Sequence, residues 1–107
     1  MISHEDFSKI ELKIATILET QRVEGSEKLL KLQVDLGTEQ RQLVAGIGKT
    51  YALDQLVGKQ IVVVANLEPR SLMGLESQGM LLAAHDTDGG PVLLIPDKQV
   101  PSGSLIK

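Results

Sequence analysis

The chain has 107 residues, which is enough for one domain with a modest core. Its content of 42% hydrophobic and 23% charged residues excludes a disordered chain, and the absence of cysteine excludes a disulfide framework or a thiolate metal site. The formal net charge of -3 gives no support by itself for a nucleic-acid partner. We therefore expect a single globular domain over residues 1–107.

The first half of the chain predicts a helical turn followed by strands. β-branched residues from about Glu11 onward favour a strand, preceded by a helical turn around Glu5–Phe7. From Leu30 to Leu36 apolar and polar residues alternate, which is the period of a half-buried strand. Gly37–Gln40 then supplies a turn, and apolar residues recur on one side from Arg41 to Ile47. The last two segments are predicted to form a hairpin.

The second half predicts one short helix and further strands. Thr50–Val57 has the apolar spacing of one or two helical turns, ended by Gly58. Ile61–Ala65 is a β-branched run, typical of a strand buried on both faces. Two more short apolar runs flank a turn of Asp and Gly residues: Met80–Ala84 and Val92–Ile95, with Asp86–Gly90 between them. The pattern predicts an all-β protein, a small barrel with one short helix.

Two motifs suggest catalysis, and neither is complete. Gly46–Thr50 resembles part of a phosphate loop, but Leu43 stands where such a loop needs its first glycine. The segment before Gly79 resembles a nucleophile elbow, but Leu75 replaces the first glycine. The chain has only two histidines, in the N-terminal tail and beside a turn, so a catalytic triad or a transition-metal site is not expected. We expect no cofactor and no enzymatic activity of the chain by itself.

Positive charge is concentrated in the middle of the chain. Between Thr20 and Arg70 there are seven Lys and Arg against six Asp and Glu, whereas the rest has four against eight. Because phosphate contacts are local, this distribution permits a modest basic patch. The acidic stretch Met1–Asp6 lacks the apolar region of a signal peptide, and the run Ile61–Ala65 is too short to span a bilayer. We expect a cytoplasmic protein with no membrane contact.

The segment Ala65–Ala84 is the strongest candidate for a binding site. It leaves a strand, runs through polar residues, one proline and two glycines, and enters another strand. Loops between barrel strands commonly carry function because the strands hold them in place. Asn, Ser and Gln side chains offer neutral donors and acceptors, and Arg70 offers a guanidinium for phosphate. A capped turn without a ligand explains this composition equally well.

Several segments in one order resemble the tRNA-binding domain family. Ala65–Ala84 resembles the family signature, and Asp6–Ile14 is similar to its opening D-F-x-K-x-D-L-R-V. Val23–Leu32 is similar to the V-E-G-S-[DE]-K-L-L form of bacterial members. Val44–Ile47 and Ile95–Asp97 also fall in family order. Members include the C-terminal domain of bacterial methionyl-tRNA synthetase, stand-alone structure-specific tRNA-binding proteins and the CsaA export chaperone.

The resemblance implies a five-stranded oligonucleotide/oligosaccharide-binding (OB) barrel, with terminal extensions that make a homodimer. It also implies tRNA as the partner, and a methionyl-tRNA synthetase catalytic domain in cis or in trans. Residues that match family positions on or near the tRNA-facing surface are Lys28, Asn66, Arg70, Ser77, Gln78 and Met80. We add Lys31 and Lys49 on the ground of charge alone. Many members carry a basic residue at Ser71 or near Met73, so this chain has less positive charge in the loop.

The residue types also constrain how RNA is bound. Barrels that grip single strands usually stack bases on several aromatic rings, and this chain has only Phe7 and Tyr51. We therefore expect non-sequence-specific contact with the backbone, riboses and shape of folded tRNA. Two alternatives stay open: a CsaA-like export chaperone on the same fold, and a module that serves mainly to dimerise a synthetase.

Overall fold

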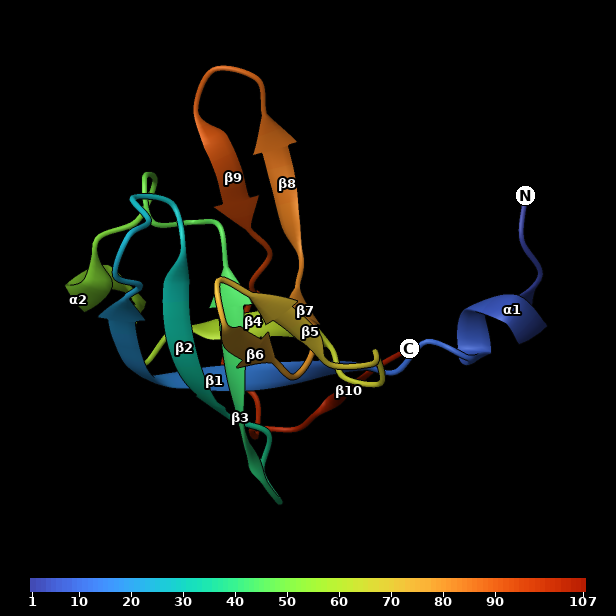
Figure 1. Cartoon of the computed structure of the whole chain (residues 1–107). Coiled ribbons are helices and arrows are strands. Elements are labelled where there is room, and N and C mark those ends of the chain that lie inside the picture. The colour runs from blue at the N-terminus through green and yellow to red at the C-terminus, as the bar shows by residue number, and fades with distance from the viewer.

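The computed structural model describes residues 1–107, and most of its regular structure is short strands (Figure 1). In chain order the elements are α1 (His4–Ser8), β1 (Leu12–Arg22), β2 (Leu30–Asp35), β3 (Gln40–Ala45), α2 (Leu53–Leu56), β4 (Gln60–Val64), β5 (Arg70–Leu72), β6 (Leu75–Ser77), β7 (Met80–Leu81), β8 (Ala83–Asp86), β9 (Gly90–Leu93) and β10 (Leu105–Ile106). Five strands form the barrel in the order β3-β2-β1-β4-β7, and β10 extends the sheet beside β1. The predicted all-β, five-stranded OB-like barrel with a short helix is confirmed.

The β2–β3 hairpin has the predicted alternation. Leu30, Leu32 and Val34 are fully buried, while Lys31 and Gln33 face outward. A continuous backbone ladder joins the two strands from the Leu30–Ala45 pair to the Asp35–Gln40 pair. Burying a Leu or Val side chain stabilises a fold by about 1.5–3 kcal/mol, so this inward row is a main source of the barrel's stability.

The other barrel strands complete the core around this hairpin. Strand β1 pairs with β2 on one side and with β4 on the other, and its ladder with β2 shifts register between Ile17 and Glu19. This irregularity lets one long strand bend around the barrel. Ile61 and Val63 are fully buried on one face of β4, and on the other face Val64 is buried and Val62 half-buried, so the predicted burial of both faces is nearly complete. Leu56 of α2 is fully buried too and packs into the same core.

The turn and helix after β3 follow the predicted pattern. The Gln55 side chain accepts a hydrogen bond from the Ala52 N–H and so caps the start of α2. Gly58, at φ +88°, ends the helical turn, as the sequence predicts. No helix in the structure is both long enough and apolar enough to cross a membrane.

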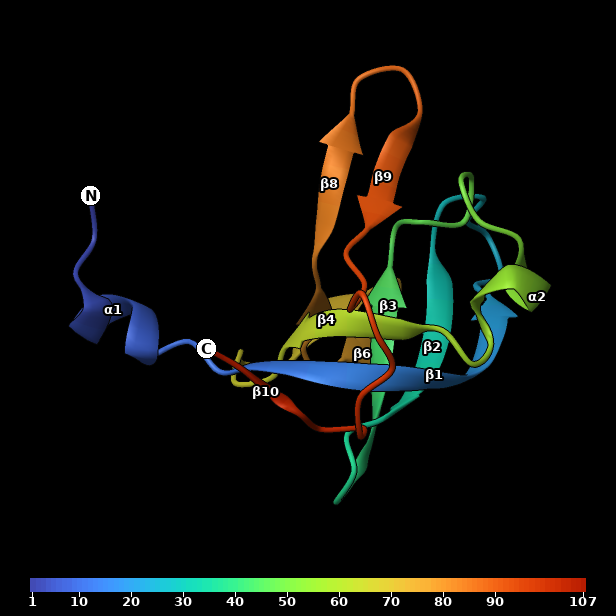
Figure 2. The same ribbon diagram turned by 180° about the vertical axis from the view of Figure 1, so that it is seen from behind.

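Two parts stand away from the barrel (Figures 1 and 2). Helix α1 lies to one side with every residue exposed, including Phe7. The β8–β9 hairpin extends from another side and turns at Asp86–Gly90, where the Asp86 carboxylate accepts from the Asp88 N–H. The predicted strand Met80–Ala84 is divided, because Met80 and Leu81 pair with β4 whereas β8 pairs with β9.

Candidate functional site

The segment between β4 and β7 folds over the outside of β3. Its middle is a small hairpin, β5–β6, which the sequence analysis treated as irregular loop. The two residues at its tip are Met73 at φ +49° and Gly74 at φ +79°. A two-residue hairpin turn with both φ values positive is usually made by Asn-Gly or Asp-Gly. Methionine at the first position therefore concealed the hairpin in the sequence.

Ser77 is held inside the structure. Its side chain is 4% exposed, and its hydroxyl accepts a hydrogen bond from the Val44 N–H at 3.0 Å. The same hydroxyl donates to the Gly79 carbonyl oxygen at 2.9 Å. The hydroxyl thus satisfies an edge amide of β3 that no neighbouring strand reaches. This geometry gives Ser77 a positioning role at the site.

Gln78 joins the same edge of β3. Its backbone N–H donates to the Gln42 carbonyl at 2.8 Å, and its side-chain oxygen accepts from the Gln42 N–H at 3.0 Å. In return, the Gln42 side-chain amide donates to the Glu76 carbonyl at 2.9 Å. We call this set of contacts, between Gln42 and Val44 of β3 and residues 76–79, the β3 seam. The seam brings β3 alongside β7 and nearly closes the barrel, through one backbone hydrogen bond and three that involve side chains.

Gly79 allows the close approach at the seam. Its φ of +131° is a conformation that residues with a side chain rarely adopt. A Cβ atom at this position would lie 3.0 Å from the Val64 carbonyl oxygen and 3.4 Å from the Leu43 side chain. The glycine of the motif is therefore required by both backbone conformation and packing.

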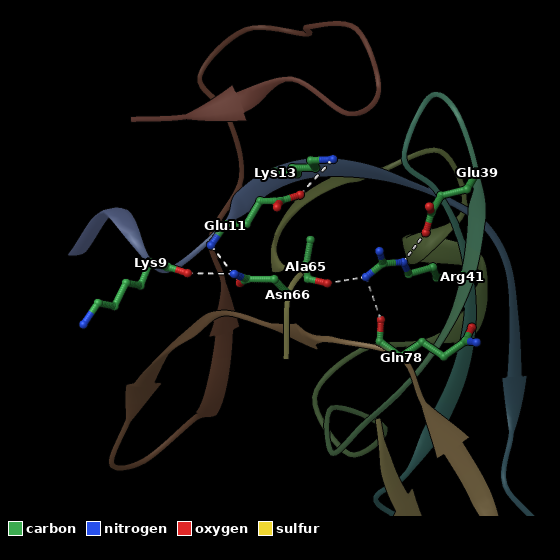
Figure 3. Close-up of polar contacts among 8 residues, drawn as sticks. All are labelled: Lys9, Glu11, Lys13, Glu39, Arg41, Ala65, Asn66 and Gln78. Atoms are coloured by element: carbon green, nitrogen blue, oxygen red, sulfur yellow. Dashed lines mark hydrogen bonds and ion pairs between the residues drawn. The ribbon is translucent and has the colours of Figure 1, made fainter. Parts of the chain in front are cut away.

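Two side chains fasten the start of the segment, as Figure 3 shows. The Arg41 guanidinium, which is paired with the Glu39 carboxylate, donates to the carbonyl oxygens of Ala65 and Gln78. On the other side, the Asn66 amide donates to the Lys9 carbonyl at 2.7 Å and accepts from the Glu11 N–H at 2.8 Å.

Asn66 therefore connects the loop to the chain that leads from α1. The predicted site residue Asn66 faces this N-terminal arm, residues 1–11, with both ends of its amide in use. Lys13 and Glu11 form an ion pair at 3.0 Å beside it.

Arg70 and Met80 remain available to a ligand. Together with Ser77 they line a pocket of about 450 Å³ between the outer face of β3 and the segment 67–80. Arg70 is exposed and takes part in none of the ion pairs of the structure, and Met80 is 48% exposed. Arg70 and Met80 are thus the two predicted site residues whose side chains are open to solvent at the pocket.

None of the three predicted lysines lines the pocket. Lys31 lies on β2, where its strand partner is Val44, which does line the pocket. The Lys28 side chain, in the turn before β2, lies across Gly46, and a Cβ there would be 2.6 Å from its Cε. Lys49 is exposed in the turn after β3.

The apolar walls and the carboxylate of the pocket were not predicted from the sequence. Val44, Leu67 and Leu72 line it, and Glu68 lines it together with Arg70. Val44 has an outward position on β3, and an apolar residue at such a position is the one signal in the sequence that something covers it. Nothing in the sequence pattern indicates that Leu67 and Leu72 line the same pocket.

Comparisons with known proteins agree on one family. The profile of the family described as "Putative tRNA binding domain" matches residues 12–105. The chain is 55% identical over 105 residues to methionine–tRNA ligase of Caldanaerobacter subterraneus subsp. tengcongensis, covering 98% of this chain and 16% of the ligase. It is 54% identical over 107 residues to methionine–tRNA ligase of Methanothrix thermoacetophila, again 16% of that protein. The chain thus spans about a sixth of the length of these relatives.

Solved structures agree over the whole chain. A MetRS-related protein from Pyrococcus horikoshii superposes with a TM-score of 0.93 and 34% identity, covering 100% of this chain and 98% of that protein. The chaperone CsaA from Bacillus anthracis has a TM-score of 0.93 and 32% identity, covering 100% and 99%. A MetRS-related protein and a chaperone therefore share this fold at similar identity to the chain.

Proposed function

The chain belongs to the tRNA-binding domain family, and from this premise we propose that it binds folded tRNA through the surface around the β5–β6 hairpin. The observation that carries the proposal is the family match over residues 12–105 together with the free Arg70 guanidinium at an open pocket. Because the chain spans 16% of the ligase relatives and matches a binding domain, it does not carry their catalytic domain. We propose that it presents tRNA to such a catalytic domain in cis or in trans, in the cytoplasm.

Binding is proposed to depend on shape and backbone rather than on stacked bases. Phe7 lies on α1, away from the pocket, and the Tyr51 hydroxyl accepts from the Leu93 N–H inside the fold. Neither ring lines the pocket. Without an aromatic platform, most contacts are expected with phosphates and riboses of a structured RNA, and these contacts are largely independent of the anticodon.

Affinity for several unrelated tRNAs and for an unstructured oligonucleotide of equal length tests this mode. We expect similar affinity among the tRNAs and weaker binding of the oligonucleotide. Because few cations face the site, the dependence of affinity on salt should be shallow. Equal or tighter binding of the unstructured oligonucleotide would contradict the proposal.

We further propose that two copies associate, so that two weak sites act on one tRNA. The N-terminal arm and the β8–β9 hairpin carry exposed apolar side chains that a monomer leaves in water, among them Ile10 at 43% and Val92 at 45% exposure. Pairing raises the effective concentration of the second site. Light scattering of the intact chain, and of Phe7→Ser as a variant in the arm, tests the association.

Two other functions remain candidates on this fold. The CsaA structures favour a peptide-binding chaperone, since the pocket walls are largely apolar. Binding of an unfolded polypeptide in the absence of tRNA binding would favour it. If the domain serves mainly to dimerise a synthetase, a monomeric variant of the domain should no longer affect the KM of the synthetase for tRNA. Each copy should still bind tRNA weakly.

A further inference from the structure

We propose that the pocket beside β3 accepts one unstacked base of the bound RNA, with guanine preferred. This proposal rests on the proposed tRNA binding and names what enters the pocket. It follows from the size of the pocket, the chemistry of its walls and the two exposed charged groups that line it.

The size of the pocket suits a single nucleoside. Its volume of about 450 Å³ lies at the lower end of the range of pockets that bury small organic ligands, about 300–1,000 Å³. A stack of several bases would need an extended groove with aromatic platforms, which this surface lacks. One base that has left its helix can fit.

The walls suit the face of a base. Val44, Leu72 and Leu67 supply aliphatic surface, and Met80 supplies a thioether at the edge. Methionine sulfur makes favourable contacts with aromatic rings, worth about 0.3–1.5 kcal/mol. Ser77 and Gly79 line the pocket as well, but the seam already uses the Ser77 hydroxyl and the Gly79 carbonyl. The interior therefore recognises an apolar ring face and offers few polar groups to it.

The two exposed charged groups that line the pocket complement a nucleotide. Glu68 and Arg70 are both exposed, and neither belongs to the ion pairs of the structure, which are Lys9–Asp6, Lys13–Glu11 and Arg41–Glu39. A guanidinium binds phosphate through its fork of N–H donors. A carboxylate only accepts hydrogen bonds, so it pairs best with two adjacent N–H donors.

This donor pattern selects guanine. The Watson–Crick edge of guanine presents its ring N–H and its amino group side by side, and both can donate to the Glu68 carboxylate. Adenine, cytosine and uracil each place an acceptor next to their donor on that edge, which the carboxylate would repel. RNA-binding proteins commonly recognise unstacked bases on this edge. A guanine at a position shared by many tRNAs would be compatible with binding regardless of anticodon.

The experiment uses the intact chain and the four nucleoside 5′-monophosphates as probes. NMR titration should show the largest shifts at the Val44, Leu72 and Met80 amides, with GMP binding about 10-fold more tightly than AMP, CMP or UMP. Glu68→Gln should weaken GMP binding about 10-fold and remove the preference, because the amide replaces one acceptor by a donor.

Glu76→Gln is the matched control. Glu76 is an exposed carboxylate on β6, in the same segment between β4 and β7 as Glu68, and it does not line the pocket. Both substitutions remove one negative charge near the site, which alone would strengthen the binding of any nucleotide. Opposite effects of the two variants on GMP affinity would support the proposal, whereas equal effects, or GMP shifts elsewhere on the surface, would overturn it.

Measuring tRNA binding with the same samples distinguishes the pocket assignment from the proposed function. If the chain binds tRNA but GMP leaves the pocket amides unshifted, the pocket assignment fails while the proposed function stands. If tRNA does not bind, the proposed function itself fails. If an unfolded polypeptide shifts the pocket amides and GMP does not displace it, the occupant is a peptide and the base assignment is wrong.

Discussion

The two edges of β3 are held in different ways. Toward β2, six residue pairs form a continuous backbone ladder, which any side chain except proline can support. Toward β7, the β3 seam relies on the Ser77 hydroxyl and the Gln78 amide to satisfy the Val44 and Gln42 N–H groups. The first edge depends on hydrophobic pattern, whereas the second depends on the identity of single residues. The residues of a short sequence motif can thus be required by the fold itself.

The same contrast exists within the motif segment. Asn66 and Ser77 have their side-chain polar atoms bonded within the protein, and the side-chain oxygen of Gln78 is bonded there as well. Arg70 and Glu68, a few residues away, have theirs exposed and outside the ion pairs. We expect substitutions in the first group to change stability, and substitutions in the second to change ligand affinity alone. The following experiments test that division, starting with the largest expected effect.

Gly79→Ala should cost the most stability, about 3 kcal/mol, because it adds strain at φ +131° to a close contact with the Val64 carbonyl. Gly74→Ala is the control. It has a positive φ of +79°, but a Cβ there has no neighbour within 4 Å, so only about 1 kcal/mol should be lost. Urea unfolding measures both. Equal losses would show that close packing at the seam is unimportant.

Ser77→Ala should lower the free energy of unfolding by about 2 kcal/mol, because it leaves the buried Val44 N–H and the Gly79 carbonyl without their partner. Hydrogen exchange at the Val44 amide should accelerate in parallel. Ser71→Ala in β5, an exposed position, should stay within about 0.5 kcal/mol of the parent protein. If hydrogen exchange at the Val44 amide is unchanged in the Ser77 variant, the Ser77 hydroxyl does not hold the β3 seam.

Asn66→Ala should destabilise the chain by about 1 kcal/mol and speed hydrogen exchange at the Glu11 amide, since it removes both hydrogen bonds to the N-terminal arm. Asn66→Asp keeps an acceptor for Glu11 but loses the donor to Lys9. It should therefore protect the Glu11 amide better than the alanine variant does. The same exchange rates in both variants would show that the amide does not hold the arm.

Arg70→Gln should leave stability within about 0.5 kcal/mol of the parent, because the side chain is exposed and outside every ion pair. Affinity for tRNA should fall a few-fold, and the slope of log affinity against log salt should drop by about 0.7–0.9 if one phosphate contact is lost. Lys98→Gln removes an exposed charge that does not line the pocket and should change neither quantity. An unaltered slope for the Arg70 variant would place the RNA elsewhere.

The barrel could be predicted because apolar and polar residues alternate periodically along its strands. The roles of the site residues could not be predicted, because they depend on where each side chain points. Leu30, Leu32 and Val34 alternate with polar residues, and alternation has one structural meaning. The residue type of Ser77 does not indicate whether its hydroxyl faces RNA or the edge of β3. Likewise Asn66 was expected on the tRNA-facing surface on the strength of the family resemblance, and the bonds of its amide to the arm were not predicted. The β5–β6 hairpin was missed because Met73 occupies a turn position that usually belongs to Asn or Asp.

The two hydrogen bonds of the Asn66 amide have a consequence for the whole molecule. Asn66 precedes Leu67 and Glu68, which line the pocket, and its amide holds the chain that leads to α1. A shift of the arm that breaks these two hydrogen bonds also releases the loop at Leu67 and Glu68, and a shift of the loop releases the arm in the same way. Any partner of the arm and any ligand of the pocket would therefore act on the same pair of hydrogen bonds, which one planar amide makes.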